Sequence, residues 1–266
     1  GCVPVFCEIN QYGSIDVDKL QTLEDSGAKA VIATGLYGDV HDHDPVEMFC
    51  KQNDMVYVND AAQSQFALYK GINSLALGDV VCMSFADNKP IPVAGTYGAV
   101  LTDDEILHEK IKVVRKNGKP DRMADYETAG VSSQPEEEKA VQVLASYQHF
   151  DEWQKRRHEI SNYYDSKFKG KISTRPRPQY SHWNAHKYTI MVADKFEAYN
   201  LLLDAGIETE RHYVDNFSRL LWTPNVDEHF DMTDRFINSS LTIPNNPFMT
   251  DEEVEMVSNT IIKLLK

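Results

Sequence analysis

The sequence predicts an α/β fold in which a mostly parallel, doubly wound sheet is followed by a smaller C-terminal α+β domain. Two observations support this fold class. In the N-terminal part, short apolar runs typical of strands alternate with segments of helical periodicity, and short loops join them. Polar side chains directly follow two of the apolar runs, as expected where neighbouring parallel strands end at one edge of a sheet.

The strands of the predicted sheet come from apolar runs that polar or glycine-containing loops bound. They are expected at residues 3–9, 28–34, 55–59, 80–83 and 99–101. Between them, residues 16–20 and 44–52 place apolar side chains at helical spacing, and residues 35–38 form a turn. Helices that alternate with strands in this way are typical of a parallel sheet.

Another helix is expected directly after the sheet. Thr102 and Glu105 have the spacing of a capping box, in which both side chains bind free backbone amides at a helix start. Leu107, Ile111 and Val114 then recur at helical spacing. This pattern predicts an amphipathic helix with a buried stripe.

Residues 116–135 are rich in Gly, Pro, Ser and charged side chains, which predicts a mobile connection between two domains. We therefore divide the chain into a large domain at residues 1–118, a connection at 119–135 and a small domain at 136–266.

The small domain is expected to begin with a long helical region over residues 136–169. Strands at 188–192 and 207–213 then flank a helix at 196–204, which Gly206 ends. A second capping box, at residues 250–253, begins the last helix. Its inner stripe is formed by Val254, Val257, Ile261 and Leu265.

Composition limits the classes of partner. The chain has 266 residues and a net charge of −14, from 27 basic and 41 acidic side chains. This balance argues against nucleic acid or an anionic membrane as a general partner, and no apolar run is long enough to cross a bilayer. The four cysteines show no metal-binding spacing and predict reduced thiols in a cytoplasmic protein.

No metal site is predicted. His41 and His43 alternate with acidic residues between positions 39 and 44. Because this spacing falls on a loop after a turn, we interpret it as a solvated loop and helix cap.

Four polar residues follow the two neighbouring strands at 55–59 and 80–83 and could converge on one site. They are Asp60, Gln63, Ser84 and Lys89. Such a set suits pyridoxal phosphate chemistry, in which a lysine amine forms a Schiff base and a carboxylate keeps the pyridine nitrogen protonated. A hydroxyl can bind the cofactor phosphate, and a side-chain amide can bind the ring oxygen.

Each of these residues also has an ordinary structural explanation. Most lysines are solvated, aspartate often caps a helix, and a serine in a turn often bonds its own backbone. A histidine at a strand end, such as His212, is as often structural as functional. For Lys89, the presence of Asp60, Gln63 and Ser84 in compatible positions favours the catalytic interpretation.

Several motifs in order give the chain a family resemblance. They are Asp-Ala-Ala-Gln-Ser at residues 60–64, Gly78-Asp79, Ser84-Phe85-x-x-x-Lys89 and Gly95-x-x-Gly98-Ala99-Val100. Together they resemble the sugar-nucleotide aminotransferases of the DegT/DnrJ/StrS type. The resemblance implies an aspartate-aminotransferase-like, fold type I enzyme that depends on pyridoxal 5′-phosphate.

The resemblance also implies roles for individual residues. Lys89 would be the Schiff-base lysine, Asp60 the partner of the pyridine nitrogen, Gln63 a contact of the ring hydroxyl and Ser84 a ligand of the phosphate. His212 would line the sugar-nucleotide site. The implied reaction moves an amino group from an amino acid, with glutamate the expected donor, to a keto-sugar nucleotide in a homodimer.

The chain departs from the family pattern in three places. Residues 130–135 replace a Gly-Tyr-Asn-x-Arg stretch whose asparagine reaches the neighbouring subunit's cofactor phosphate; Ser132 keeps a hydrogen-bond donor there, but the arginine is lost. Residues 95–98 replace Gly-Asp-Gly-Gly, and the chain begins at a strand inside the family's large domain. A truncated, non-catalytic binding or assembly partner is therefore the alternative, whereas sugar dehydration on the same cofactor is disfavoured because that change replaces the lysine by histidine.

Overall fold

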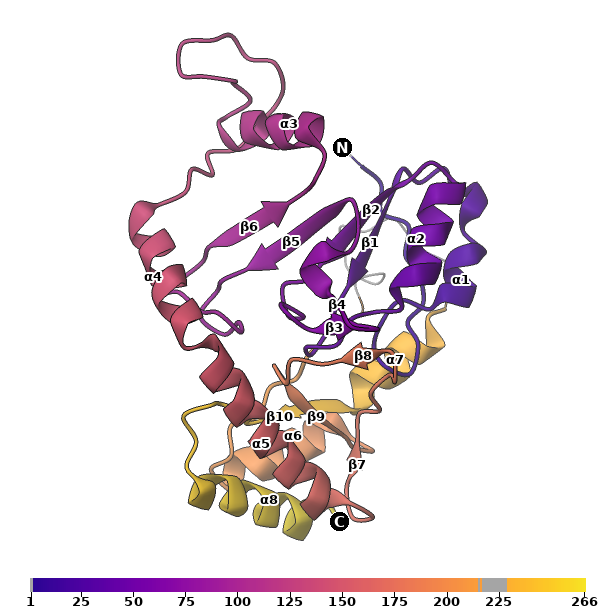
Figure 1. The fold of residues 1–266 in the computed structure, drawn as a ribbon. Coiled ribbons are helices and arrows are strands. Elements are labelled where there is room, and N and C mark those ends of the chain that lie inside the picture. Colours follow the sequence, from indigo (N-terminus) through magenta and orange to yellow (C-terminus); the bar gives the residue numbers. More distant parts are fainter. Residues whose placement is uncertain (1, 215, 217–228) are drawn as a thin grey trace.

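The computed structural model describes residues 2–214, 216 and 229–266. A four-stranded sheet and its helices form one part of the molecule, and the C-terminal helices and strands form another below it in Figure 1. None of the described helices combines the length and the apolar character that are needed to cross a bilayer.

The main sheet has the strand order β1-β2-β5-β6. β1 (Ala30–Thr34), β2 (Val56–Asp60) and β5 (Val80–Ser84) run parallel, whereas β6 (Gly98–Leu101) is antiparallel to β5 at the edge. Four of the five predicted strands are thus confirmed, and the sheet is mostly parallel. The carboxyl ends of the neighbouring parallel strands β2 and β5 therefore lie at the same edge of the sheet.

One face of the sheet is covered by α1 (Val17–Gln21) and α2 (His43–Gln52), as the periodicity predicts. Asp16 begins α1, because its carboxylate accepts hydrogen bonds from two free backbone amides. The buried cluster under these helices is formed by Leu20, Val31, Ala33, Val46, Phe49, Cys50, Met55 and Tyr57. Two short 3-10 helices, Glu24–Ser26 and Ser74–Ala76, complete this part.

A small antiparallel sheet joins the two parts of the chain. Its strand order is β4-β3-β8, and its strands are β3 (Leu68–Tyr69), β4 (Ile72–Asn73) and β8 (Ser181–His182). Because β8 comes from the C-terminal half of the sequence, this sheet fixes the segment that follows it against the N-terminal part.

The C-terminal part packs helices on a third sheet of order β10-β9-β7. Its strands are β7 (Ser173–Thr174), β9 (Tyr188–Met191) and β10 (Ser240–Ile243), and its helices include α6 (Lys195–Asp204), α7 (Asp231–Ser239) and α8 (Asp251–Leu265). The predicted strand at 188–192, Gly206 after α6 with a positive φ of 78°, and the capping box of Thr250 and Glu253 are all confirmed. The sequence did not predict α7 or β10.

The long helical region is divided in two. α4 (Glu137–Gln148) and α5 (Phe150–Phe168) meet at His149, which ends one helix and begins the other. The buried side of α5 joins the C-terminal core, whose largest members include Ile160, Tyr164, Phe168, Tyr188, Ile190, Leu202, Leu241 and Ile261.

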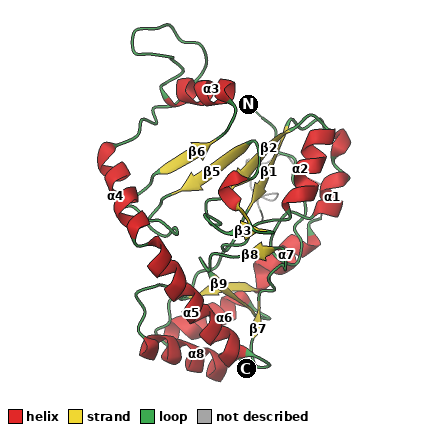
Figure 2. Cartoon of the chain, viewed as in Figure 1, coloured by secondary structure: helices red, strands yellow, loops and turns green. Residues whose placement is uncertain are grey.

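Two predicted strands are wrong, at residues 3–9 and 207–213; both segments are loops in Figure 2. A strand requires a neighbour with which it can pair along its length. In each segment only one residue pairs in this way among the described residues: Ile9 with Ile15, and Glu210 with Thr242. Glu8, from the first segment, instead accepts hydrogen bonds from the backbone amides at the start of α7.

The predicted cap of α3 (Glu105–Arg115) is also wrong. Asp104 stands directly before the helix and accepts the amides of the first turn, at 2.8 and 3.0 Å. The Thr102 hydroxyl instead donates to the Asp79 carbonyl. The expected buried stripe is absent as well, because none of the α3 side chains is buried in the described structure.

Candidate active site

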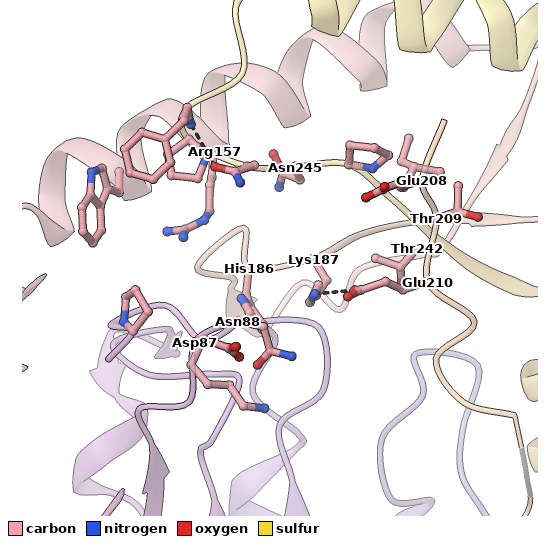
Figure 3. Close-up of a pocket in the computed structure, with 18 of the residues that line it drawn as sticks. Asp87, Asn88, Arg157, His186, Lys187, Glu208, Thr209, Glu210, Thr242 and Asn245 are labelled. Atoms are coloured by element: carbon pink, nitrogen blue, oxygen red, sulfur yellow. Dashed lines mark hydrogen bonds and ion pairs between the residues drawn. The ribbon is translucent and has the colours of Figure 1, made fainter. Parts of the chain in front are cut away.

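A cavity of about 670 Å³ lies where the two parts of the molecule meet (Figure 3). The β5–β6 connection contributes Lys89, α5 contributes Arg157, and the segment before β9 contributes His186 and Lys187. The segment after α6, which includes Glu210, and the end of β10 with the segment that follows it close the other side. The carboxyl end of the parallel sheet therefore faces the C-terminal part across this cavity.

Lys89 lies half-buried on the β5–β6 connection, where its backbone amide donates to the Ala86 carbonyl at 2.9 Å. Burial is the main reason why the pKa of the Lys89 amine is lowered. The nearby cation of Lys187 lowers this pKa further, whereas the carboxylates of Asp60 and Glu210 oppose the shift. The site thus favours a neutral, nucleophilic amine more than open solvent does.

Asp60 ends β2, next to the end of β5. Its Oδ1 atom accepts a hydrogen bond from the Ala62 amide at 3.0 Å, which stabilises a turn; no helix follows for Asp60 to cap, because residues 62–66 form turns. The charge of Asp60 also raises the pKa of the Lys89 amine and that of the Tyr213 hydroxyl. In both groups burial has a larger effect on the pKa than this charge does. The structure therefore brings Asp60 and Lys89, which are far apart in sequence, into one electrostatic environment.

Gln63 is buried, and both ends of its amide have partners. Oε1 accepts from the Tyr37 backbone amide at 2.9 Å, and Nε2 donates to the Tyr213 hydroxyl at 2.7 Å. These two bonds fix the orientation of the amide beside Asp60.

The two serines lie in different places. Ser84 ends β5, and its Oγ accepts a long hydrogen bond from the Ala86 amide at 3.4 Å, as in the turn that the sequence left open. Ser132 is exposed in the α3–α4 connection, where its backbone pairs with Lys116, and neither serine is among the residues that line the cavity of this chain.

His212 lies close to the cavity. Its Nδ1 atom is 3.3 Å from the Thr242 hydroxyl and 3.5 Å from the Glu210 carboxylate. Burial lowers the pKa of its imidazole, and the Glu210 carboxylate opposes that effect. Lys187 and Lys89 also act on this pKa, so His212 and Lys89 share the same charged surroundings.

Sequence analysis missed most of the residues that line the cavity, among them Arg157, His186 and Lys187. Lys187 forms an ion pair with Glu210 at 2.5 Å. Nothing in the local sequence distinguishes these three side chains from surface residues, because their burial depends on contacts between distant segments.

The prediction that His41 and His43 lie in a solvated loop is wrong. Both side chains are buried, and both are hydrogen-bonded to the Tyr57 hydroxyl. Burial lowers the pKa of His41 to about 3, which keeps the imidazole neutral in this polar cluster. Within the described residues, no group of three or more His, Cys, Asp or Glu side chains could hold a metal ion.

The chain matches the sequence model of the DegT/DnrJ/EryC1/StrS aminotransferase family over residues 1–262. It is 25% identical over 259 residues to the UDP-2-acetamido-2-deoxy-3-oxo-D-glucuronate aminotransferase of Pseudomonas aeruginosa, with 97% of this chain and 72% of that protein covered. It is 28% identical over 269 residues to the dTDP-3-amino-3,6-dideoxy-alpha-D-galactopyranose transaminase of Aneurinibacillus thermoaerophilus, covering 98% and 72%.

Solved structures establish the fold. Helicobacter pylori PseC, an aminotransferase involved in the biosynthesis of pseudoaminic acid, superposes with a TM-score of 0.90 at 22% identity, covering 99% of this chain and 74% of that one. An aminotransferase of the same family from Brucella abortus also gives a TM-score of 0.90, at 20% identity, with 97% and 72% covered. The predicted fold type I architecture is confirmed.

Proposed function

The chain belongs to the DegT/DnrJ/EryC1/StrS aminotransferase family, and on this premise we propose that it transfers an amino group from glutamate to a keto-sugar nucleotide. One observation carries the proposal: a half-buried lysine with a lowered pKa lines the cavity and lies in the electrostatic reach of Asp60. The names of the two relatives above support the substrate class, since both describe amino transfer on nucleotide-linked sugars.

The residues present fit pyridoxal 5′-phosphate. Bound pyridoxal phosphate supplies an aldehyde that condenses with an amine and a protonated ring that stabilises negative charge on the reacting carbon. Lys89 offers the amine, and Asp60 offers a carboxylate for the ring nitrogen. The Ala62 amide occupies Oδ1 of Asp60, and among the described residues no hydrogen-bond donor contacts Oδ2, which remains for this contact. Gln63 and Ser84 would contact the ring hydroxyl and the phosphate.

Lys89 has two tasks in this proposal. As a neutral amine, its Nζ atom holds the cofactor as a Schiff base. As a base, the same atom would accept the proton that leaves the substrate carbon. Burial favours both tasks, since it lowers the pKa of the amine. His212 and the ion pair of Lys187 and Glu210 set the charge around this atom.

We further propose that a second copy of this chain covers an exposed apolar surface on the β6 side of the sheet. Its side chains come from β6, α3, the connection and α4, and they are Val100, Leu101, Ile106, Val114, Val131, Val141, Leu144 and Tyr147. Large exposed apolar patches mark interaction surfaces. Ser132 lies among these residues, so a homodimer would let it reach the partner's phosphate site. In the same proposal, residues 119–135 connect domains 1–118 and 136–266.

A charge placed on this apolar surface tests the dimer. Leu144 is 64% exposed, and Leu144→Asp should weaken self-association by about 100-fold, because a buried unpaired carboxylate costs several kcal/mol. Sedimentation equilibrium measures the change. Met256→Asp, at an exposed position on α8, is the matched control and should leave the association unchanged. Equal weakening by both variants would count against this surface.

An absorption spectrum tests the amino-transfer function. The protein is incubated with pyridoxal phosphate, its near-ultraviolet and visible spectrum is recorded, and glutamate is added. We expect a band of lysine-attached cofactor that glutamate converts to the pyridoxamine phosphate form. A folded protein without this band would instead support the non-catalytic binding or assembly partner.

A further inference from the structure

We propose that Arg157 binds a carboxylate group of a substrate in the cavity that Lys89 lines. The proposal rests on the proposed function in one respect only: it takes this cavity to be the substrate site. It adds a specificity-determining residue and the chemical class of the group that this residue recognises.

Arg157 is a buried cation that faces a cavity. Arg157 is 8% exposed and lies on the side of α5 that contacts the C-terminal core. Within the described residues, its guanidinium makes no hydrogen bond and no ion pair. Figure 3 shows the guanidinium turned into the cavity, on the same side as His186. A buried charge without a partner is costly, so an incoming anion would satisfy it.

The backbone at Arg157 is held in place by a short network. The Ser161 hydroxyl donates to the Arg157 carbonyl at 2.8 Å. Asn245 donates to the Ser161 hydroxyl at 3.2 Å and to the Ala185 carbonyl at 2.7 Å. These bonds tie α5 to the segments beside β9 and β10. Arg157 is therefore presented from a fixed position rather than from a free surface helix.

The charges around Arg157 favour an anion. Burial lowers the pKa of its guanidinium to about 10, with no neighbouring carboxylate to offset the effect, so the group stays charged at neutral pH. Glu210 is already paired with Lys187. His186 adds a second unsatisfied group: its side chain is buried and its Nε2 has no partner among the described residues.

A carboxylate fits this site better than a phosphate does. The planar guanidinium matches the two oxygens of a carboxylate, and one positive charge balances one negative charge. Burial and nearby cations lower the pKa of His186 well below its usual value, so His186 offers a neutral donor rather than a second cation. Two sources carry a carboxylate: the amino-acid donor, and a sugar acid such as the glucuronate named for the Pseudomonas aeruginosa relative.

Calorimetric titration of the cofactor-free protein with glutarate tests the carboxylate site directly. We expect glutarate to bind the wild type, Arg157→Gln to weaken binding at least tenfold, and Arg157→Lys to fall between them. Glutaramide, which has the same length and no charge, should not bind. Arg156→Gln is the matched control, because Arg156 is the neighbouring residue of α5 and pairs with Asp251 instead. Absence of glutarate binding, equal binding by Arg157→Gln, or an Arg157-dependent site that takes only inorganic phosphate would each overturn the proposal.

The cofactor-loaded protein identifies the source of the carboxylate. If the donor supplies it, Arg157→Gln raises the apparent Kd for L-glutamate at least tenfold in the spectral assay. If a sugar acid supplies it, the glutamate value is unchanged, and the variant loses its discrimination between acidic and neutral keto-sugar nucleotides. If neither value changes, the proposal is wrong. A protein that shows no spectral change at all contradicts the amino-transfer function, whereas the glutarate titration still decides the role of Arg157.

Discussion

Two buried arginines of this chain lie in opposite surroundings. Arg175 is 4% exposed, forms an ion pair with the equally buried Asp39 and donates to the Tyr12 carbonyl at 3.1 Å. Arg157 is 8% exposed, and no described residue neutralises it. Both lie where segments distant in sequence meet, but only the first arginine has its charge paired by a described carboxylate.

The difference separates structural charge from charge available to a ligand. The guanidinium of Arg175 also lies over the Tyr37 ring, 5.1 Å from its centroid, so an aromatic face and a carboxylate both contact this cation. The cavity region instead gathers Arg157, Lys89 and the Lys187–Glu210 pair around open space. Such incomplete clusters are typical of functional sites, whereas complete ones stabilise the fold.

The largest effect is expected at Lys89, in the incomplete region. Lys89→Ala removes both the amine that we propose holds the cofactor and the base that we propose moves the substrate proton, so amino transfer should fall at least about 1000-fold. Steady-state kinetics and the absorption spectrum measure this loss. Lys70→Ala is the control, since Lys70 is exposed and paired with Asp44. A Lys89→Ala protein that keeps the lysine-attached spectrum would contradict the assignment.

The next effect concerns the complete region. Arg175→Met should lower the free energy of unfolding by about 3–5 kcal/mol, because it leaves the Asp39 carboxylate buried and unpaired. Denaturant-induced unfolding measures the change. Adding Asp39→Asn removes that charge and should restore part of the loss. A double variant as unstable as the single one would show that packing, rather than charge pairing, holds this region together.

The same substitution should have the opposite sign at Arg157. Arg157→Met keeps an apolar stem and removes an unpaired buried charge, so ligand-free stability should rise by about 2 kcal/mol. The folded-state pKa of about 10 lies below the usual 12.5, so burying this charge costs free energy wherever the pH is below about 10. The gain should therefore be full at neutral pH and shrink above about pH 10. Destabilisation at pH 7 would mean that Arg157 already has a structural partner.

The convergence of Asp60 and Lys89 could be predicted because parallel strands end at one edge of a sheet. Only the position of each residue at the end of an apolar run or in the loop that follows it was needed for that step. Arg157 could not be found in this way. It lies on an ordinary helix, and that helix is joined through Ser161 to Asn245, which is distant in the sequence.

The wrong strands at 3–9 and 207–213 have a related cause. Alternation of apolar and polar side chains shows that a segment can pair, but not that a neighbouring strand is available to it. The unburied stripe of α3 shows the same limit for helices: periodicity identifies an apolar face but not what covers it.

The smallest effect concerns the ion pair beside Lys89, and its sign can be reversed. Lys187→Met removes a cation that lowers the pKa of Lys89 and frees Glu210, which raises it, so the pKa should rise. Glu210→Gln does the opposite: it removes an anion and leaves Lys187 unpaired, so the pKa should fall. Asp60 and His212, which also act in this cluster, are unchanged in both variants.

The pH dependence of the rate at which Lys89 condenses with pyridoxal phosphate measures both shifts, because only the neutral amine reacts. At pH 7 the Lys187→Met protein should react more slowly than the wild type and the Glu210→Gln protein faster, each by less than about tenfold. The double variant should return towards the wild type, since it removes one charge of each sign. If both single variants shift the inflection of the pH profile in the same direction, the ion pair acts on the pKa of Lys89 through its geometry rather than through its charges. The charged cavity would then differ less from the Arg175 region than the electrostatics of the two regions indicate.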